Sequence, residues 1–196
     1  MNSSYADQVK SLAGVIFDLD GTLVDSQLDF TALRQSLDCP AGLGVLEFID
    51  TLPARERAQA HEAVLAFEQQ GADRATLMPG ARACLDALHQ WQLPVAILTR
   101  NAGTVARHTL QRLGFAVDLL LAREDCAPKP APDGLLQIAG HWNVPAQNCV
   151  YVGDYLFDLQ AARNAGMLSC YYDPHASAEF SALADWHIRH LAQLHT

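Results

Sequence analysis

The sequence predicts a doubly wound parallel α/β sheet, a Rossmann-type core, with a small all-helical cap inserted after the first strand. Short apolar runs alternate along the chain with longer amphipathic stretches. The runs have the length of strands and lack regular polar alternation, which is typical of parallel strands covered on both faces. One long stretch, 25–78, has no strand pattern and shows helical patterns instead. Strands that alternate with helices favour a sheet with helices on both faces.

The core elements follow from these runs. Four of the runs are predicted to be strands, at 14–18, 95–99, 149–153 and 168–172. Two of the intervening helices have an apolar face at helical spacing, formed by Ala81, Leu85 and Leu88 in one and by Ala106, Leu110 and Leu113 in the other. Gly114 is expected to end the second of these helices.

The segment 25–78 is predicted to hold three helices, at 29–37, 45–49 and 53–70. Pro53 suits the first turn of the third helix, and Gly71 is expected to end it. Ala60, Val64 and Phe67 form one face of that helix.

We therefore expect a core of residues 1–24 and 79–196 and a cap of residues 25–78. A lid over a site is a common reason to keep such an insertion.

Composition excludes several classes of protein. The chain has 13 lysines and arginines and 22 aspartates and glutamates. The resulting net charge of −9 repels nucleic acid backbones. The chain has no apolar run of membrane-spanning length, and its first twelve residues lack the apolar stretch of a secretion signal. Five cysteines without a C-x-x-C pair favour neither a disulfide framework nor a zinc site. We expect a soluble, cytoplasmic protein without nucleic acid or membrane partners, and no pattern indicates its oligomeric state.

The first motif, Asp-Leu-Asp-Gly-Thr-Leu at 18–23, directly follows the first predicted strand. Ligands bind at this end of the strands in open α/β sheets. Asp18 and Asp20 are costly to bury there unless a cation neutralises them, and Mg²⁺ prefers all-oxygen sites. The alternative is an ordinary turn in which Asp20 caps a helix.

The second motif, Leu-Thr-Arg-Asn at 98–101, ends another predicted strand and precedes a helix near Gly103. The Thr99 hydroxyl and the free amides of a helix start suit phosphate oxygens. Thr99 is equally well explained as a helix cap.

The third motif places Lys129 between Pro128 and Pro130, in a chain that has one other lysine, Lys10. The prolines restrict the backbone and so hold the lysine in a defined place. The alternative is a linker lysine without a role.

The fourth motif, Gly-Asp-Tyr-Leu-Phe-Asp at 153–158, follows the predicted strand 149–153. If Asp154 caps the following helix, Asp158 lies one turn further along and faces the same way. The alternative is a helix cap followed by a solvated aspartate.

Each of the four motifs follows a predicted strand or opens a helix, so one sheet edge is expected to gather them. Together they supply four carboxylates, one lysine and one hydroxyl. Such a cluster repels a phosphate dianion unless a cation is present, and with Mg²⁺ it becomes a phosphate site.

The order and spacing of these motifs resemble the haloacid dehalogenase superfamily of phosphohydrolases. The resemblance extends from Gly14 to about Leu194. The helical segment occupies the cap position of the branch that includes phosphoglycolate phosphatases and β-phosphoglucomutases, although it is shorter than the usual cap of that branch.

The resemblance implies a role for each residue of the first motif. Asp18 is expected to be the nucleophile that forms an aspartyl-phosphate. Asp20 is expected to protonate the leaving oxygen and then to activate water.

The resemblance also implies ligand sets for phosphate and metal. Thr99 and the residues that follow it, Arg100 and Asn101, are expected to bind the phosphoryl group, and Lys129 to neutralise it. The Mg²⁺ site is expected to consist of Asp18, the backbone carbonyl of Asp20, Asp154 and, supporting the metal-bound waters, Asp158.

We therefore expect a Mg²⁺-dependent phosphatase that hydrolyses a small phosphorylated metabolite. A phosphomutase and a non-catalytic phosphate-binding module remain alternatives, as does a nucleotide-sugar transferase that uses its D-x-D motif to hold a metal. The resemblance argues against dehalogenation because Asp20 is present, and it excludes phosphonatase chemistry because the cap has no lysine.

Two groups of basic residues receive no role. The basic residues of the cap are expected to face solvent; they are Arg34, Arg55, Arg57, His61 and Arg74. The histidines at 187, 190 and 195 match no metal-ligand spacing, and a late strand with a surface helix is the simpler interpretation.

Overall fold

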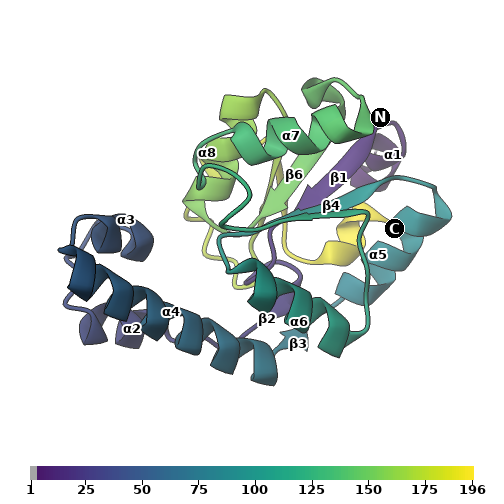
Figure 1. Cartoon of the computed structure of the whole chain (residues 1–196). Helices are drawn as coiled ribbons and strands as arrows, with labels where there is room; N and C mark the ends of the chain where they lie inside the picture. The colour runs from purple at the N-terminus through teal and green to yellow at the C-terminus, as the bar shows by residue number, and fades with distance from the viewer. Residues whose placement is uncertain (1–3) are drawn as a thin grey trace.

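A sheet of six parallel strands runs through the centre of the molecule (Figure 1). The structure is a computed structural model that describes residues 4–196, so the first three residues of the predicted core lie outside the described residues. The spatial order is β5-β4-β1-β6-β7-β8. The strands are β1 (Gly14–Phe17), β4 (Val95–Leu98), β5 (Leu119–Leu121), β6 (Cys149–Gly153), β7 (Leu168–Tyr172) and β8 (Trp186–Ile188).

Helices cover both faces of this sheet. The alternation of side chains along β1 sends Val15 and Phe17 to one face and Ile16 to the other. The first face packs against α1 (Tyr5–Lys10), α5 (Ala81–Gln90) and α6 (Gly103–Leu113), and the second against α7 (Asp133–Trp142) and α8 (Leu156–Ala165). Figure 1 shows α7 and α8 above the sheet and α5 and α6 below it. The predicted doubly wound α/β fold is confirmed.

The structure adds elements at both edges of the sheet. The edge strand β5, with three half-buried leucines, was not predicted, because a three-residue run gives no periodicity to detect. The late strand expected near the histidines is β8, which pairs with β7. Short 3₁₀ turns complete the core at Ala146–Asn148, Ser181–Leu183 and Leu191–Leu194. No helix among residues 4–196 is long and apolar enough to span a membrane.

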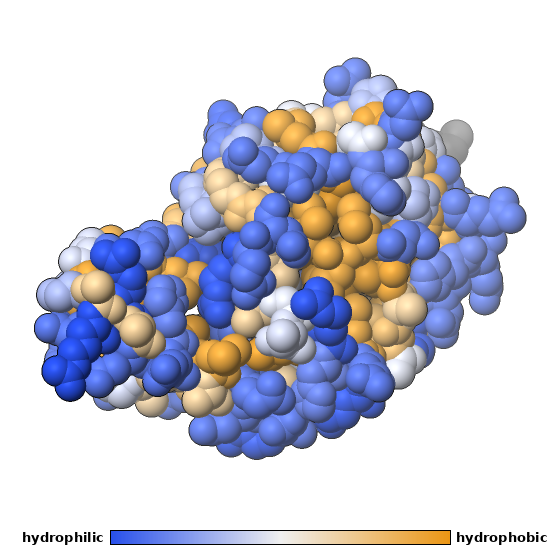
Figure 2. Space-filling view, viewed as in Figure 1, coloured by the Kyte–Doolittle hydropathy of each residue, from blue (hydrophilic) through white to orange (hydrophobic). Residues whose placement is uncertain are grey.

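The cap holds the three expected helices, α2 (Phe30–Ser36), α3 (Val45–Asp50) and α4 (Ala54–Arg74). Two short strands, β2 (Val24–Asp25) and β3 (Thr76–Leu77), pair antiparallel where the chain leaves and re-enters the core. This pair was not predicted, since two-residue strands have no periodicity. In the space-filling view the cap is a lobe at the lower left, with a hollow between it and the core (Figure 2).

The end predicted for the third cap helix is wrong. Helix α4 continues through Gly71 to Arg74. Gly71 is buried, and a Cβ atom at this position would lie 2.7 Å from Cγ of Leu28. The glycine therefore permits close packing of the chain segment before α2 and does not stop the helix.

The cap has a small apolar core of its own and also contacts the main core. Its centre is formed by Leu33, Ile49, Ala60 and Val64. The last turns of α4 pack on α6, where Arg112 donates hydrogen bonds to the carbonyls of Ala72 and Ala75. The division into a core of 1–24 and 79–196 and a cap of 25–78 stays a prediction.

Candidate active site

Three carboxylates meet at the carboxyl ends of β1 and β6. These strands are neighbours in the sheet, and the Asp18 amide donates a 2.9 Å hydrogen bond to the Val152 carbonyl. Asp18 follows β1, Asp154 follows β6, and Asp158 lies in the first turn of α8. One carboxylate oxygen from each of the three lies within 4.8 Å of the others. The strand ends thus bring together the acids of the first and fourth motifs.

The turn after Asp20 brings the first motif against Asp154. Gly21 has a φ of 82°, a conformation that favours glycine, and a Cβ atom there would lie 2.7 Å from Cγ of Asp154. The next residue, Thr22, is fully buried and donates a 3.0 Å hydrogen bond to Oδ1 of Asp154. The motif is therefore more than an ordinary turn, because its residues fix the position of a carboxylate from another strand.

Lys129 is buried and donates three hydrogen bonds. Its Nζ lies 2.7 Å from Oδ1 of Asp18, 2.6 Å from Oδ1 of Asp158 and 2.9 Å from the Tyr151 hydroxyl. An ammonium group has three donors, so this geometry uses all of them. Lys129 is thus a fixed internal cation between two acids, and the alternative of a linker lysine is wrong.

Tyr151 is a site residue that the sequence interpretation missed. Its hydroxyl lies 3.0 Å from the Leu98 carbonyl oxygen and 3.1 Å from Oδ1 of Asp158. The available signal was a tyrosine inside the aliphatic strand β6, since a buried phenol needs a polar partner.

Asp158 is 2% exposed and uses both carboxylate oxygens within the chain. Oδ1 accepts from Lys129, and Oδ2 accepts a 3.0 Å hydrogen bond from the Tyr155 amide at the start of α8. The capping residue of α8 is Tyr155, so the alternative of Asp154 as a cap followed by a solvated Asp158 is wrong.

The loop after β4 places the second motif beside Asp20. The Asn101 side-chain amide donates to Oδ2 of Asp20, and the Asn101 backbone amide donates a 3.2 Å hydrogen bond to the hydroxyl of buried Thr99. Helix α6 begins only at Gly103, with Ala102 as its capping residue, so Thr99 does not cap it.

Arg100 turns toward the cap. It forms a 2.6 Å ion pair with Glu47 of α3, and its guanidinium carbon lies 5.4 Å from the centre of the Phe157 ring. The phosphate role predicted for Arg100 stays a prediction, and in this structure its charge is balanced by Glu47.

Burial shapes the electrostatics of the carboxylates. Burial raises the pKa of Asp18 well above its usual range, against the opposing charge of Lys129, and Asp158 and Asp154 raise it further. Burial, and then the charge of Asp158, raises the pKa of Asp154 to about 7. Burial also raises the pKa of Asp20. Burial lowers the pKa of Lys129, but Asp158 and Asp18 outweigh it and hold the pKa above its usual range.

This donor set fits a hard divalent cation. The cluster consists of carboxylate oxygens with one internal ammonium group, and it carries more negative charge than Lys129 balances. Mg²⁺ prefers oxygen ligands and usually takes one or two carboxylates together with waters. A cation there would offset the burial and the mutual repulsion that raise the pKa of Asp18 and of Asp154.

A cavity of about 420 Å³ opens above these groups, between core and cap. This volume lies in the range of small-molecule sites. Arg34 of α2 reaches this cavity, whereas Arg55, Arg57 and Arg74 are exposed as expected. The residues from the core that line it are Asp18, Asp20, Thr99, Arg100, Asn101, Lys129, Asp154, Tyr155, Phe157 and Asp158.

Comparisons with known proteins identify the family and the fold of the chain. The family model for haloacid dehalogenase-like hydrolases matches residues 12–166. A haloacid dehalogenase-like hydrolase domain-containing protein of Arabidopsis thaliana is 29% identical over 83% of this chain and 71% of its own length. A phosphoglycolate phosphatase of Xanthomonas campestris is 32% identical over 79% of this chain and 80% of its own length. The solved structure of a hydrolase from Pseudomonas syringae superposes with a TM-score of 0.79 at 22% identity, covering 93% of this chain and 95% of that one.

Proposed function

Because this chain belongs to the haloacid dehalogenase-like hydrolase family, we propose that it is a Mg²⁺-dependent phosphatase. The substrate is a small phosphorylated metabolite, and the reaction passes through an aspartyl-phosphate. The observation that carries this proposal is the position of Asp18, which lies 2.7 Å from the Lys129 ammonium and within the cluster of Asp154 and Asp158. Relatives named phosphoglycolate phosphatase support ester hydrolysis as the reaction.

Asp18 acts as the nucleophile and Asp20 as the acid and base. A carboxylate oxygen of Asp18 attacks phosphorus, so that an Asp18 oxygen–phosphorus bond forms while the bond to the ester oxygen breaks. Asp20 gives its proton to the departing alkoxide, and it then takes a proton from the water that hydrolyses the aspartyl-phosphate. Burial raises the pKa of Asp20, which suits a carboxyl group that must carry a proton in the first step.

The remaining residues position these groups. Lys129 holds Asp18 through Oδ1, and Asn101 holds Asp20 through Oδ2. Thr99 and the loop amides that follow it bind the oxygens of the transferring phosphoryl group, since such transfer depends mainly on positioning and charge stabilisation.

The metal site consists of Asp18, the backbone carbonyl of Asp20 and Asp154. When bound there, Mg²⁺ supplies charge neutralisation for the phosphate and for the nucleophile. We do not count Asp158 among the direct ligands, because its oxygens already accept hydrogen bonds from Lys129 and from the Tyr155 amide. Its role would be to support metal-bound waters.

Two alternatives remain within this geometry. A phosphomutase would use the same groups but would transfer the phosphoryl group to a sugar hydroxyl and release little phosphate. A non-catalytic binding module would have no use for Asp20 held beside Asp18, and the hydrogen bond from Asn101 to Asp20 therefore favours catalysis.

The test is phosphate release from a panel of phosphomonoesters, with Mg²⁺ and with chelator, by the wild type and by Asp18→Asn. We expect release only with Mg²⁺, and a loss of at least about 1,000-fold in Asp18→Asn because the nucleophile is removed. Asp86→Asn, an exposed change on α5, is the matched control and keeps wild-type activity. Undiminished release by Asp18→Asn would overturn the proposal, as would the absence of release from every ester by a protein that binds Mg²⁺ in calorimetry.

A further inference from the structure

The two ends of the active-site cavity differ in chemistry. At the floor lie the carboxylates and Lys129, where the phosphate is placed by the proposed function. The walls that face this floor are mostly apolar. The apolar residues come from all three cap helices and from the start of α8, and they are Phe30, Leu33, Val45, Leu46, Val64, Phe67 and Phe157. The alcohol part of a bound ester would therefore lie against hydrocarbon and aromatic surface.

The guanidinium groups that reach these walls already have partners. Arg100 is paired with Glu47 at 2.6 Å. Arg34 donates through Nη1 to the Leu43 carbonyl at 2.6 Å, and through Nη2 to the Pro40 carbonyl. Arg34 thus holds the loop between α2 and α3. A carboxylate on the substrate would have to compete with these contacts.

The acidic side chain that lines the cap wall is also paired. Glu68 of α4 is 7% exposed and accepts hydrogen bonds from Arg123, the shorter being 2.8 Å, and from the Ala102 amide. The charge of Glu68 is balanced by Arg123, so Glu68 does not need a cationic group on the substrate as a partner.

Exposed aromatic rings stand on both sides of the cavity. Phe30 is 52% exposed and lies edge-on to Phe67 at 5.7 Å between ring centres. On the core side Tyr155 is also 52% exposed and packs at 5.4 Å against Phe157. Large exposed rings beside a cavity gain free energy when an apolar group covers them.

We propose that the substrate is a phosphate monoester whose alcohol part is an uncharged apolar group, such as an alkyl or arylalkyl chain, and that a short carboxylated ester such as phosphoglycolate is a poor substrate. This inference rests on the proposed function, since it assigns the other end of the same cavity. The proposed substrate differs from phosphoglycolate, the substrate in the names of the phosphoglycolate phosphatase relatives.

The first experiment measures kcat/KM for ethyl, butyl and hexyl phosphate and for phosphoglycolate. The alkyl esters have leaving groups of similar basicity, so differences among them report binding of the chain. We expect kcat/KM to rise about fourfold per added methylene, the factor that corresponds to about 0.8 kcal/mol per buried CH₂. Hexyl phosphate should exceed phosphoglycolate by at least about 100-fold on the same basis. A series in which phosphoglycolate is the best ester overturns the inference and leaves the phosphatase proposal intact.

The second experiment changes the wall of the cavity. Phe30→Ala removes an aromatic side chain from the opening and should lower the ratio of kcat/KM for hexyl to ethyl phosphate at least about fivefold. Leu65→Ala is the matched control, because Leu65 is an exposed apolar residue on α4 outside the cavity lining. An unchanged ratio in Phe30→Ala contradicts the inference.

A binding measurement separates this inference from the reaction itself. Two non-hydrolysable phosphonates of similar length, n-butylphosphonate and 3-phosphonopropionate, differ in that the second carries a carboxylate. Calorimetry with the Mg²⁺-loaded protein should give tighter binding of n-butylphosphonate, even if no ester is turned over. Preference for 3-phosphonopropionate would overturn the inference, whereas failure of the phosphatase proposal would appear as absent phosphate release with n-butylphosphonate still preferred.

Discussion

Single backbone and side-chain positions control the candidate site. Gly21 combines a positive φ with close approach to the Asp154 carboxyl group, so its lack of a side chain serves two requirements at once. Lys129 and Tyr151 are buried polar residues whose hydrogen bonds converge on Asp158. Each of these residues acts on a carboxylate from another part of the chain, which explains why small local changes should alter the metal site.

Gly21→Ala should lower Mg²⁺ affinity about 10- to 100-fold, the usual effect of losing support behind a metal ligand. The added methyl group would push against Asp154. Gly42→Ala separates this clash from backbone strain, since Gly42 has a φ of 81° but open space around its Cβ position. Titration calorimetry with Mg²⁺ compares both variants with the wild type. Equal affinities for the two variants would contradict the role given to Gly21.

Asp173, just after β7, provides a stabilising carboxylate away from the candidate site. Burial raises its pKa, but hydrogen bonds from the amides of Ala178 and Ser177, together with that from His187, outweigh burial and lower the pKa to about 2. A carboxyl group whose pKa falls on folding stabilises the folded state above its unfolded pKa, near 3.9. This contribution disappears as the pH falls from about 4 to about 2.

Asp173→Asn should therefore lower the free energy of unfolding at pH 7 by about 1–3 kcal/mol, because charge-assisted hydrogen bonds are lost. The difference from the wild type should shrink as the pH falls below 4. Urea unfolding at several pH values measures it. A difference that stays constant down to pH 2.5 would show that the carboxylate charge has no such role.

At the scale of elements, α4 connects the cap to the loop that carries the second motif. Glu68 accepts a 3.2 Å hydrogen bond from the Ala102 amide and pairs with Arg123, and the Arg123 amide donates a 3.0 Å hydrogen bond to the Asn101 carbonyl. A second contact joins Asp73 of α4 to His108 of α6 at 2.9 Å. The position of the cap helix is thus coupled to the loop that holds Asp20.

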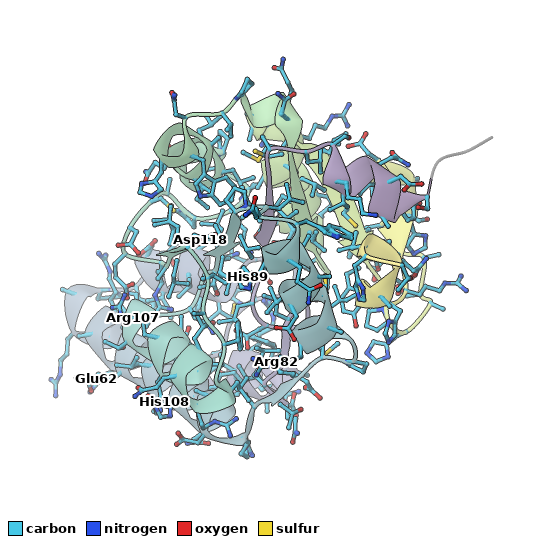
Figure 3. All side chains as sticks on the ribbon, turned by 90° about the vertical axis from the view of Figure 1, so that its right-hand side faces the viewer. Glu62, Arg82, His89, Arg107, His108 and Asp118 are labelled. Atoms are coloured by element: carbon cyan, nitrogen blue, oxygen red, sulfur yellow. The ribbon has the colours of Figure 1, made fainter. Side chains whose placement is uncertain are left out.

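Glu68→Gln should destabilise the protein by about 1–3 kcal/mol, because Arg123 loses a charged partner in a mostly buried place. It should also lower kcat/KM about tenfold by loosening the loop around Asn101. Glu62→Gln, an exposed change on the same helix (Figure 3), should leave both quantities unchanged. Urea unfolding and steady-state kinetics provide the two measurements. Wild-type values of both for Glu68→Gln would mean that α4 does not support the loop.

For the molecule as a whole, the close carboxylates of the acidic cluster lower the stability of the fold, although the proposed function needs them to bind a cation. Burial and the neighbouring Asp158 raise the pKa of Asp154 to about 7, so the folded chain holds this carboxylate at a cost. A divalent cation that binds only the folded state offsets this cost, and this relief forms part of its binding free energy and so of the stabilisation it gives.

We expect Mg²⁺ at 100 times its dissociation constant to stabilise the wild type by about 2.7 kcal/mol. In chelator, Asp154→Asn should be more stable than the wild type by about 1–2 kcal/mol, because it removes one of three close carboxylates. The same variant should lose the Mg²⁺-dependent gain. Urea unfolding in chelator and in Mg²⁺ tests both statements. A less stable Asp154→Asn in chelator would contradict this account.

The sequence predicts the central part of the fold and misses its smallest elements. The strands at 149–153 and 168–172 are predicted because they are buried on both faces and therefore consist of continuous apolar runs. The strands β2, β3 and β5 have two or three residues and leave no such run. Gly71 was misinterpreted because sequence alone does not distinguish a glycine that ends a helix from one that allows close packing.

The acidic part of the candidate site is predictable because parallel strands end at one edge of a sheet. This rule places Asp18 and Asp154 together before any coordinates are known. Glu68 is not predictable in this way, because its role arises from packing against Arg123, 55 residues further along the chain, which no local pattern records. Tyr151 gives only the weaker signal of a phenol inside an aliphatic strand, and its contacts with Leu98 and Lys129 arise from packing between separate elements.

The paired strands β2 and β3 have a consequence for how such proteins diversify. Asp25 and Thr76 face each other, so the chain departs from the core and returns to it at adjacent points. Because this pair lies outside the six-stranded sheet, a change in the length of the segment between β2 and β3 need not alter the register of that sheet. Related genes can therefore differ in the segment between β2 and β3, and so in the esters that their proteins bind. The six-stranded sheet and the acidic cluster at its edge are kept.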